Sequence, residues 1–384
     1  MNLNNNEQEI IINDKETGAV AYLVIHNTVN GMTTGGLRIG NSVSLEEIRK
    51  LAFIMSLKIK AYNLPVGGGK CGLKLPDGIS QQERTEILLR LAERFRGVLT
   101  NTFILGEDMG SIPSEIDMMY KHIGTSQIMV SIELLKRAKV KNYLRYIPNF
   151  ILKNLVSSYK SYGTDITAHT VLCSLKAISQ AKNYNLNSMQ IALQGVGSIG
   201  KKIIEYCKNE KLTIVKVADL NGCIYSPHGL DLDGVLKAIS ERGIIDRAML
   251  KKSCDFEELH RDEWFKGKSD ILIPAAIPDA FNKENRNEVS TKIILEAANI
   301  PMDIETDQYF YYKGITVIPD FIASSGIPCS FGLIAAGRVQ PYNIPEIYKI
   351  VNKMIGEVVN TGYSISNKDG VSIRKALYNH LGII

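Results

Sequence analysis

The chain has few of the features that mark secreted, metal-binding or membrane proteins. Its six cysteines are scattered without a Cys-x-x-Cys pair, which argues against a zinc site or a disulfide framework and favours a reducing compartment. Its six histidines show no metal-ligand spacing. No apolar run reaches membrane-spanning length, and the Asn-rich, acidic segment Met1–Glu7 does not resemble a signal peptide. We therefore expect a soluble, cytoplasmic protein with no metal and no membrane partner.

The chain also has only a small net charge and little low-complexity sequence. The net charge is only +5 over 384 residues, and no internal repeat is evident. This balance suits anionic small molecules and does not argue for a nucleic-acid partner. A hydrophobic content of 45% is enough to bury a large core, and the length predicts two domains.

The first part of the chain predicts an α/β domain that covers residues 1–162. Its expected elements are two strands within residues 9–26, a helix from Ser44, a glycine-rich loop at Gly67–Lys70, a helix from Ser80 to about Leu99 and a strand at Thr102–Leu105. The helix start is indicated by Ser44 with Glu47 three residues later, the pattern of a capping box.

Residues 126–160 differ from the rest of this domain. They carry seven basic residues against the single acid Glu133. We interpret them as a basic helical insertion with a solvated face. A nucleic-acid surface is the weaker interpretation.

A second domain is expected over residues 163–340. Short apolar strands alternate there with helical segments, a pattern typical of a parallel, doubly wound sheet. Residues 341–384 are expected to form helices that pack back on the first domain.

A dinucleotide fingerprint lies near the start of this second domain. Gly195, Gly197 and Gly200 follow a predicted strand and open a predicted helix, and Asp219 lies nineteen residues after Gly200. The glycines would permit a tight turn, the approach of a pyrophosphate and close helix–strand packing. Asp219 would accept from a ribose 2′-hydroxyl and repel a 2′-phosphate, which favours NAD over NADP.

Two lysines flank a segment rich in glycine. At about 100° per residue, Lys58 shares the apolar helix face of Leu51 and Met55, whereas Lys60 points to the opposite side. Lys70 follows three glycines, where backbone can approach a ligand closely. A buried ammonium needs an anionic partner. Snorkelling and solvation would explain either lysine alone, but together they predict an anion site.

A carboxyl group follows the last strand of the first domain. Asp108 is a natural general acid or base, particularly if burial raises its pKa toward neutrality. A turn-capping role is the alternative. Glu107 is a rival that the sequence does not rank below Asp108.

These residues together resemble a known family. The motifs that carry the resemblance are Gly35-Gly36-Leu-Arg38, Lys58, Leu64-Pro65-Val-Gly67-Gly68-Gly69-Lys70, Glu107-Asp108-Met-Gly110, Gln194-Gly-Val-Gly-Ser-Ile-Gly200, Glu296-Ala-Ala-Asn299 and Ile318-Pro-Asp-Phe-Ile322. In this order they are similar to the glutamate/leucine/phenylalanine/valine dehydrogenases, which interconvert an L-amino acid with its 2-oxo acid and ammonia using NAD(P). The resemblance implies a substrate domain followed by a Rossmann-type NAD-binding domain, and a homo-oligomer assembled through the first domain.

The resemblance also implies roles for particular residues. Lys58 would hold the substrate carboxylate, Lys70 would be the catalytic lysine and Asp108 would move protons, with Gly35 and Gly36 lining the substrate floor. The residues assigned to the cofactor are Thr167, Gly195, Gly197, Ser198, Ile199, Gly200, Asp219, Ala298 and Asn299.

Departures from the family pattern concern the substrate side chain. Thr34 stands where glutamate dehydrogenases carry a lysine, so a substrate carboxylate would lack its partner. Gly106 replaces alanine of the branched-chain enzymes and Ser324 replaces an asparagine, while Pro328 and Phe331 would form the far wall. We predict a neutral, aliphatic or aromatic L-amino acid as substrate and, with Thr34 and Gly106, a roomier pocket. A relative acting on a non-proteinogenic oxo or imino compound and an inactive NAD-binding regulator are the alternatives.

Overall fold

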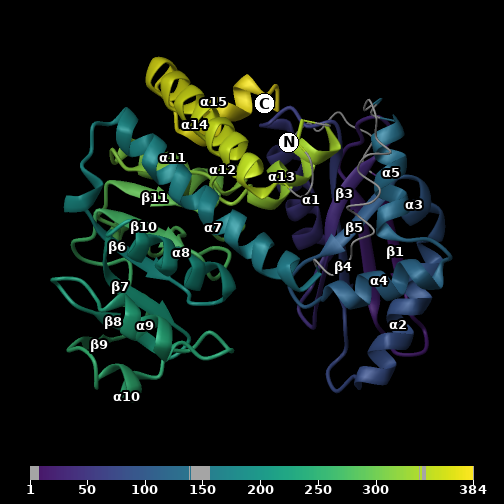
Figure 1. Cartoon of the computed structure of the whole chain (residues 1–384), viewed down its shortest axis with the longest axis horizontal. Helices are drawn as coiled ribbons and strands as arrows, with labels where there is room; N and C mark the ends of the chain where they lie inside the picture. The colour runs from purple at the N-terminus through teal and green to yellow at the C-terminus, as the bar shows by residue number, and fades with distance from the viewer. Residues whose placement is uncertain (1–7, 138, 140–155, 337, 340–342, 384) are drawn as a thin grey trace. The chain divides into compact units, whose positions relative to one another are not determined.

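The computed structural model describes residues 8–137, 139, 156–336, 338–339 and 343–383. These residues form two compact units, each with its own sheet (Figure 1). The first unit comprises residues 1–158 and 328–347, and the second comprises 159–327 and 348–384. Within the basic insertion predicted at 126–160, residues 138 and 140–155 lie outside the described residues.

The first unit is an α/β unit built on a five-stranded sheet. Its elements are β1 (Gln8–Asn13), β2 (Val20–Ile25), β3 (Thr33–Gly40), α1 (Leu45–Lys60), β4 (Gly67–Lys74), α2 (Gln81–Arg94), α3 (Arg96–Asn101), β5 (Phe103–Glu107), α4 (Pro113–His122) and α5 (Gln127–Arg137). The strand order is β1-β2-β4-β3-β5, and β3 runs parallel to both of its neighbours.

The glycine-rich segment before Lys70 is a strand, which corrects the predicted loop. Gly67 to Lys74 form β4, buried along all but its last residue. A Cβ at Gly68 would lie 2.2 Å from the backbone nitrogen of Ser56 in α1, and one at Gly67 would lie 2.1 Å from the carbonyl oxygen of Asn27. Glycine is therefore required here because helix and loop backbone lie directly against the strand.

Helix α1 follows the prediction from its cap and its periodicity. The Ser44 side chain accepts a hydrogen bond from the backbone N–H of Glu47 at 3.2 Å. The apolar face packs on β4, with Ile48 fully buried and Leu51 5% exposed. Lys58 lies on this buried face, whereas Lys60 is exposed.

The second unit contains the remaining elements. They are α7 (Val156–Ala181), η3 (Leu186–Ser188), β6 (Gln190–Gln194), α8 (Ser198–Asn209), β7 (Thr213–Asp219), β8 (Gly222–Tyr225), α9 (Leu232–Ala238), α10 (Arg247–Leu250), β9 (Glu257–Leu259), η4 (Arg261–Glu263), β10 (Ile271–Pro274), η5 (Arg286–Glu288), β11 (Ile293–Leu295), α11 (Ile304–Tyr312), β12 (Thr316–Ile318), α12 (Asp320–Ala323), α14 (Ile344–Asp369) and α15 (Ile373–His380). Helix α13 (Gly326–Ala335) begins in this unit, and from Pro328 it belongs to the first.

The second sheet is mostly parallel, as the alternation of strands and helices predicts. Five strands in the order β12-β11-β10-β6-β7 run parallel, and β8 and β9 add an antiparallel edge. The two antiparallel strands follow a tight turn after Asp219, where Gly222 has a φ of 150°. Buried aromatic side chains, including Trp264, Phe281 and Phe310, fill the core on one side of the parallel strands.

The C-terminal helices group with the second unit from residue 348, whereas the sequence led us to expect packing on the first domain. Helix α15 contacts α11 and β12 (Figure 1). The contact has an electrostatic reason, since Arg374 is 4% exposed and its Nη2 lies 2.6 Å from Glu296. Its Nε also lies 3.3 Å from Asp307. The domain boundaries at residues 162 and 340 stay predictions.

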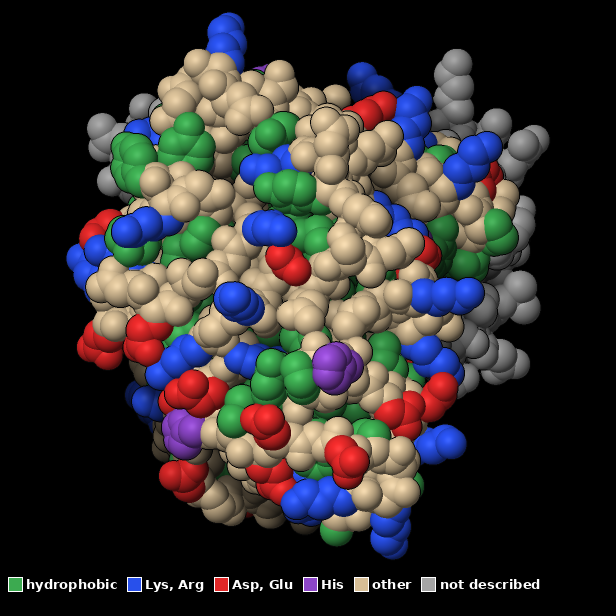
Figure 2. Space-filling view, turned by 90° about the vertical axis from the view of Figure 1, so that its left-hand side faces the viewer, with side chains coloured by type: hydrophobic (Ala, Val, Ile, Leu, Met, Phe, Trp, Pro, Cys, Tyr) green, Lys and Arg blue, Asp and Glu red, His purple; other side chains and the backbone are tan. Residues whose placement is uncertain are grey.

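The surface carries charges of both signs side by side. On the face in Figure 2, Lys and Arg side chains alternate with Asp and Glu, and hydrophobic side chains are gathered in separate patches. Charged side chains of the second unit form ion pairs, such as Lys251 with Glu258 at 2.6 Å and Lys292 with Asp270 at 2.9 Å. Within the described residues, no helix is both long and apolar enough to cross a membrane.

Candidate active site

A buried cluster of opposite charges links three neighbouring strands of the first sheet, β4, β3 and β5. Lys70 on β4 places its Nζ 3.0 Å from Oδ2 of Asp108, which directly follows β5. Arg38 on β3 donates from Nε to the same oxygen at 2.9 Å. The Lys70 and Asp108 side chains are 11% and 20% exposed. The structure thus brings together the predicted catalytic lysine and aspartate.

The two cations determine the charge state of the aspartate. Burial alone would raise the pKa of Asp108, but the charges and hydrogen bonds of Lys70 and Arg38 hold that pKa well below its ordinary value. Burial therefore does not bring this pKa toward neutrality, the condition that most favoured a general acid or base. Asp108 is ionised in this conformation. The rival Glu107 is exposed, so the geometry favours Asp108.

Arg38 is a member of this cluster that the sequence interpretation did not assign to the site. Its guanidinium lies between Asp108 and Glu47, and Nη1 lies 2.5 Å from Glu47 Oε1. Glu47 belongs to the first turn of α1, where the helix dipole favours an anion. The Gly-Gly-Leu-Arg motif contained the signal, because an arginine on a buried strand needs a carboxylate partner.

The glycines predicted to line the substrate floor are surrounded by protein. A Cβ at Gly35 would lie 2.0 Å from the carbonyl oxygen of Gly69, and one at Gly36 would lie 2.9 Å from the Cβ of Asp108. Close strand packing therefore excludes side chains at both positions. Gly36 in particular lets Asp108 approach β3. Contact of these glycines with substrate stays a prediction.

A second polar network supports the start of the same strand. Asn27 accepts the backbone N–H of Gly68 at 2.8 Å and the hydroxyl of Ser56 at 2.7 Å. Nδ1 of His26 lies 2.8 Å from the same Ser56 oxygen. This network fixes α1 against β4 just before Lys70. Nothing in the local sequence pattern indicated it.

Thr34 and Gly106 are two of the residues that we predict to decide the choice of substrate. The Thr34 hydroxyl donates to the Ile104 carbonyl oxygen at 3.1 Å, and the residue is 9% exposed. Among the described residues, a Cβ at Gly106 would have one neighbour within 4 Å, Nε2 of Gln127 at 4.0 Å. Position 106 therefore has room for a larger group, and position 34 contributes no positive charge.

Pro328 and Phe331 lie on the part of α13 that belongs to the first unit. The backbone of Gly332 on this helix packs against Leu64, since a Cβ there would lie 2.3 Å from a Leu64 methyl carbon. Leu64 precedes β4, so the helix borders the segment that leads to Lys70. Pro328 is buried and Phe331 is partly exposed.

The glycine fingerprint in the second unit has the geometry that a dinucleotide needs. Gly195 has a φ of 94° and donates its N–H to the Ala218 carbonyl oxygen at 2.8 Å. A Cβ at Gly200 would lie 2.0 Å from the Gly195 carbonyl oxygen. Gly197 and Ser198 are exposed at the start of α8, and no side chain caps this helix. Its free N–H groups fit a pyrophosphate, and Ile199 follows in the same turn.

Asp219 lies at the end of β7, as predicted, but its carboxylate already has four donors. Two come from Arg247, at 2.8 and 3.0 Å. The others are the backbone N–H groups of Asn221 at 2.8 Å and Ile245 at 2.7 Å. Burial would raise the pKa of Asp219, and these hydrogen bonds bring it below its ordinary value instead. The sequence interpretation did not foresee the ion pair with Arg247.

The predicted cofactor residues Ala298 and Asn299 and the predicted substrate residue Ser324 lie near Asp320. Asp320 accepts the N–H of Ile300, which has an unusual φ of 51° and follows Ala298 and Asn299. The Ser324 hydroxyl donates to the Asp320 carbonyl oxygen at 2.9 Å. Asp320 therefore connects the loop after β11 to the Ser324 segment.

Thr167 on α7 lies beside this group. A Cβ at Gly326 would lie 2.8 Å from the Thr167 backbone nitrogen, and the Thr170 hydroxyl donates to the Ala323 carbonyl oxygen at 2.9 Å. The predicted residues 167, 298–299 and 324 are thus neighbours within the second unit. Their roles toward a cofactor stay predictions.

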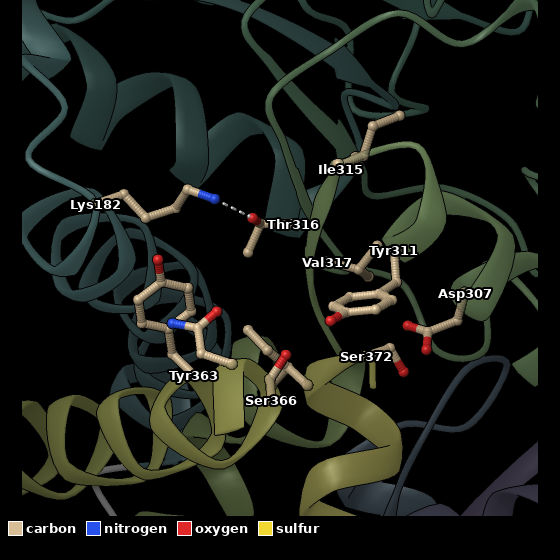
Figure 3. A pocket seen from close by; sticks show the side chains of 12 residues that line it. Lys182, Asp307, Tyr311, Ile315, Thr316, Val317, Tyr363, Ser366 and Ser372 are labelled. Atoms are coloured by element: carbon tan, nitrogen blue, oxygen red, sulfur yellow. Dashed lines mark hydrogen bonds between the residues drawn. The ribbon is translucent and has the colours of Figure 1, made fainter. Parts of the chain in front are cut away.

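A separate pocket of about 100 Å³ lies at the β12 edge of the second sheet (Figure 3). It contains none of the predicted site residues. Its charged lining groups have partners, because Lys182 donates to Thr316 at 2.8 Å and Asp307 lies beside Arg374. Among the residues that the structure describes, no group of three or more His, Cys, Asp or Glu could hold a metal ion.

Comparison with known proteins places this geometry in context. The sequence model described as Glutamate/Leucine/Phenylalanine/Valine dehydrogenase matches residues 157–379, and the dimerisation domain of the Glu/Leu/Phe/Val dehydrogenases matches residues 7–125. The chain is 25% identical to the NAD-specific glutamate dehydrogenase of Staphylococcus aureus over 361 residues, which are 93% of this chain and 82% of that protein.

Two solved structures show the same fold. The hetero-hexameric glutamate dehydrogenase of Thermus thermophilus, in its leucine-bound form, superimposes with a TM-score of 0.75 at 22% identity, covering 98% of this chain and 87% of that one. L-tryptophan dehydrogenase from Nostoc punctiforme superimposes with a TM-score of 0.64 at 20% identity, covering 98% and 94%.

Proposed function

The chain belongs to the glutamate/leucine/phenylalanine/valine dehydrogenase family, and on this premise we propose that it oxidises a neutral L-amino acid reversibly with NAD. The protein is an oxidoreductase that acts on CH–NH₂ donors. The reaction converts the amino acid, water and NAD⁺ to the 2-oxo acid, ammonium, NADH and a proton. The observation that carries the proposal is the buried contact between Lys70 and Asp108 in the first unit.

The charge state of Asp108 suits the first proton transfer. A substrate ammonium must lose a proton before its α-carbon can give up a hydride. Lys70 and Arg38 keep Asp108 ionised, and it is the acceptor that we propose for that proton once Lys70 bonds the substrate and no longer lowers the pKa of this carboxyl. The backbone N–H groups at the start of α8 would hold the pyrophosphate of NAD⁺, which would supply the hydride acceptor. Its presence in the family and the NAD-specific relative both support this choice.

The two lysines then have separate tasks. Lys58 is 8% exposed in the last turn of α1, and we propose that it binds the substrate carboxylate. Lys70 donates to the 2-oxo oxygen and stabilises the negative charge that develops there when water adds or leaves. Because Asp108 lies 3.0 Å away, it can exchange protons with the same reacting atoms.

The preference for a neutral side chain is proposed from the absence of a cation at position 34. Thr34 directs its hydroxyl to a backbone carbonyl, so a substrate carboxylate there would lose its hydration without gaining a partner. The space beside Gly106 supports an aliphatic or aromatic side chain. We further propose a cytoplasmic homo-oligomer assembled through the first unit, which matches a dimerisation domain.

A panel of L-amino acids tests this proposal. We expect NADH formation, followed by absorbance, to be fastest with a neutral amino acid and at least about tenfold slower with glutamate. Faster turnover of glutamate than of every neutral member contradicts the substrate assignment. NAD binding without turnover of any member favours the regulator.

A further inference from the structure

Asp219 has no acceptor capacity left for a ribose. Its side chain is fully buried, and four N–H groups converge on its two oxygens. The backbone donors of Asn221 and Ile245 are fixed by the chain. Only Arg247 can leave, because its guanidinium is at the end of a flexible side chain and is 15% exposed.

Arg247 has a second carboxylate within reach. Its Nε lies 3.6 Å from Glu258 on β9, and that residue also pairs with Lys251. Arg247 therefore sits between a buried and a half-exposed carboxylate, and one cation compensates the charge of Asp219 locally. An aspartate at this position repels a 2′-phosphate only if no cation neutralises its negative charge.

The segment that carries Arg247 also touches the glycine fingerprint. A Cβ at Gly243 would lie 3.3 Å from the Cα and the backbone nitrogen of Gly197. One segment, residues 243–247, therefore borders both the predicted pyrophosphate position and the predicted ribose position. A guanidinium at this place is suited to the 2′-phosphate of NADP through its positive charge, while its two Nη groups donate to Asp219.

We propose that Arg247 is a cofactor-specificity residue, which neutralises Asp219 so that the protein accepts NADPH as well as NADH. The inference rests on the proposed function, because it assumes that the dinucleotide binds at the α8 fingerprint. Arg247 either remains on Asp219 and faces the 2′-phosphate, or turns toward Glu258 when the ribose 2′-hydroxyl takes its place. Both arrangements keep the guanidinium paired.

Calorimetric titration of the full chain with NADH and with NADPH tests the proposal without turnover. We expect the two dissociation constants of the wild type to agree within about tenfold. Arg247→Gln exposes the aspartate charge and should raise the NADPH/NADH ratio of dissociation constants by at least about tenfold. Asp219→Asn removes that charge and should lower the ratio. Lys252→Gln, an equal charge change at an exposed position, should leave it unchanged.

The variants Arg247→Gln and Asp219→Asn together distinguish the possible outcomes. Because they are expected to shift the ratio in opposite directions, one remains informative if thermal unfolding of the apo-protein shows that the other does not fold. The proposal is overturned if the NADPH/NADH ratio of dissociation constants is the same in the wild type, R247Q and D219N. It is also overturned if the wild type binds NADH more than about a hundredfold more tightly than NADPH. Failure of the wild type to bind either cofactor instead overturns the proposed function.

Discussion

Two groups of buried carboxylates, one in each unit, have opposite charge states for a simple reason. Asp108 shares two cations, Lys70 and Arg38, and its pKa is held well below the ordinary range. Among the described residues, Glu296 shares one cation, Arg374, with the carboxyls of Asp307 and Asp320, and burial raises its pKa to about 8. Burial together with the number of cations beside each carboxyl accounts for which of the two is ionised at neutral pH. An ionised Asp108 can accept a proton, whereas a protonated Glu296 contributes to structure.

Replacing the carboxyl of Asp108 or of Glu296 by an amide should show the largest difference between the two groups. Asp108→Asn removes the proposed proton acceptor and should lower kcat by about 10³-fold. Glu296→Gln keeps a neutral group of the same shape and should change kcat by less than about fivefold. Initial rates with the best substrate of the amino acid panel measure both. Similar losses in the two variants would mean that Asp108 has no special catalytic part.

Removing the cation of the second group should have the next largest effect. Arg374→Leu leaves Glu296, Asp307 and Asp320 without their common partner, and we expect the free energy of unfolding to fall by about 3–5 kcal/mol. Urea denaturation measures this loss. The neighbouring Lys375 is exposed, so Lys375→Leu is the matched control and should cost less than about 0.5 kcal/mol. Equal losses of unfolding free energy in the two variants would contradict the role of Arg374 in holding α15.

The pH dependence of stability should differ between the two groups by sign. Glu296 ionises near pH 4.5 when unfolded and near pH 8 when folded, so the folded state holds the extra proton between these values. Stability should therefore decrease from pH 4.5 to 8, by up to about 1.4 kcal/mol per pH unit. Asp108, with a lowered folded pKa, contributes stability above the ordinary carboxyl range and loses it only in stronger acid.

Denaturation curves at several pH values measure this dependence. Glu296→Gln should flatten the decrease between pH 4.5 and 8 and leave the acid limb in place. A wild-type protein whose stability rises steadily across that range would show that Glu296 is ionised in the folded state.

The features that local sequence pattern predicted are those that depend on near neighbours. The cap at Ser44 and the inward face of Lys58 follow from helical periodicity, and the glycine fingerprint follows from the order strand, turn, helix. The resemblance to the family identified Lys70 and Asp108 as a pair before any distance was known.

What the pattern missed depends on contacts between distant segments. Three consecutive glycines predict a turn, but pairing of β4 with β2 and β3 makes Gly67–Lys70 a buried strand. Arg38 reaches Asp108 across 70 positions, and Arg247 reaches Asp219 across 28. Such partners become evident only when strands and loops are placed in space. The roles of Gly35 and Ser324 toward a substrate remain predictions for the same reason.

The most direct test of the central claim, that Lys70 and Asp108 form the catalytic pair, is the turnover of Lys70→Ala. We expect its kcat to fall by about 10³-fold or more, while calorimetry shows NADH binding within about threefold of the wild type. Lys60→Ala, on the exposed side of α1, should retain wild-type turnover. Activity of Lys70→Ala close to that of Lys60→Ala would contradict the account.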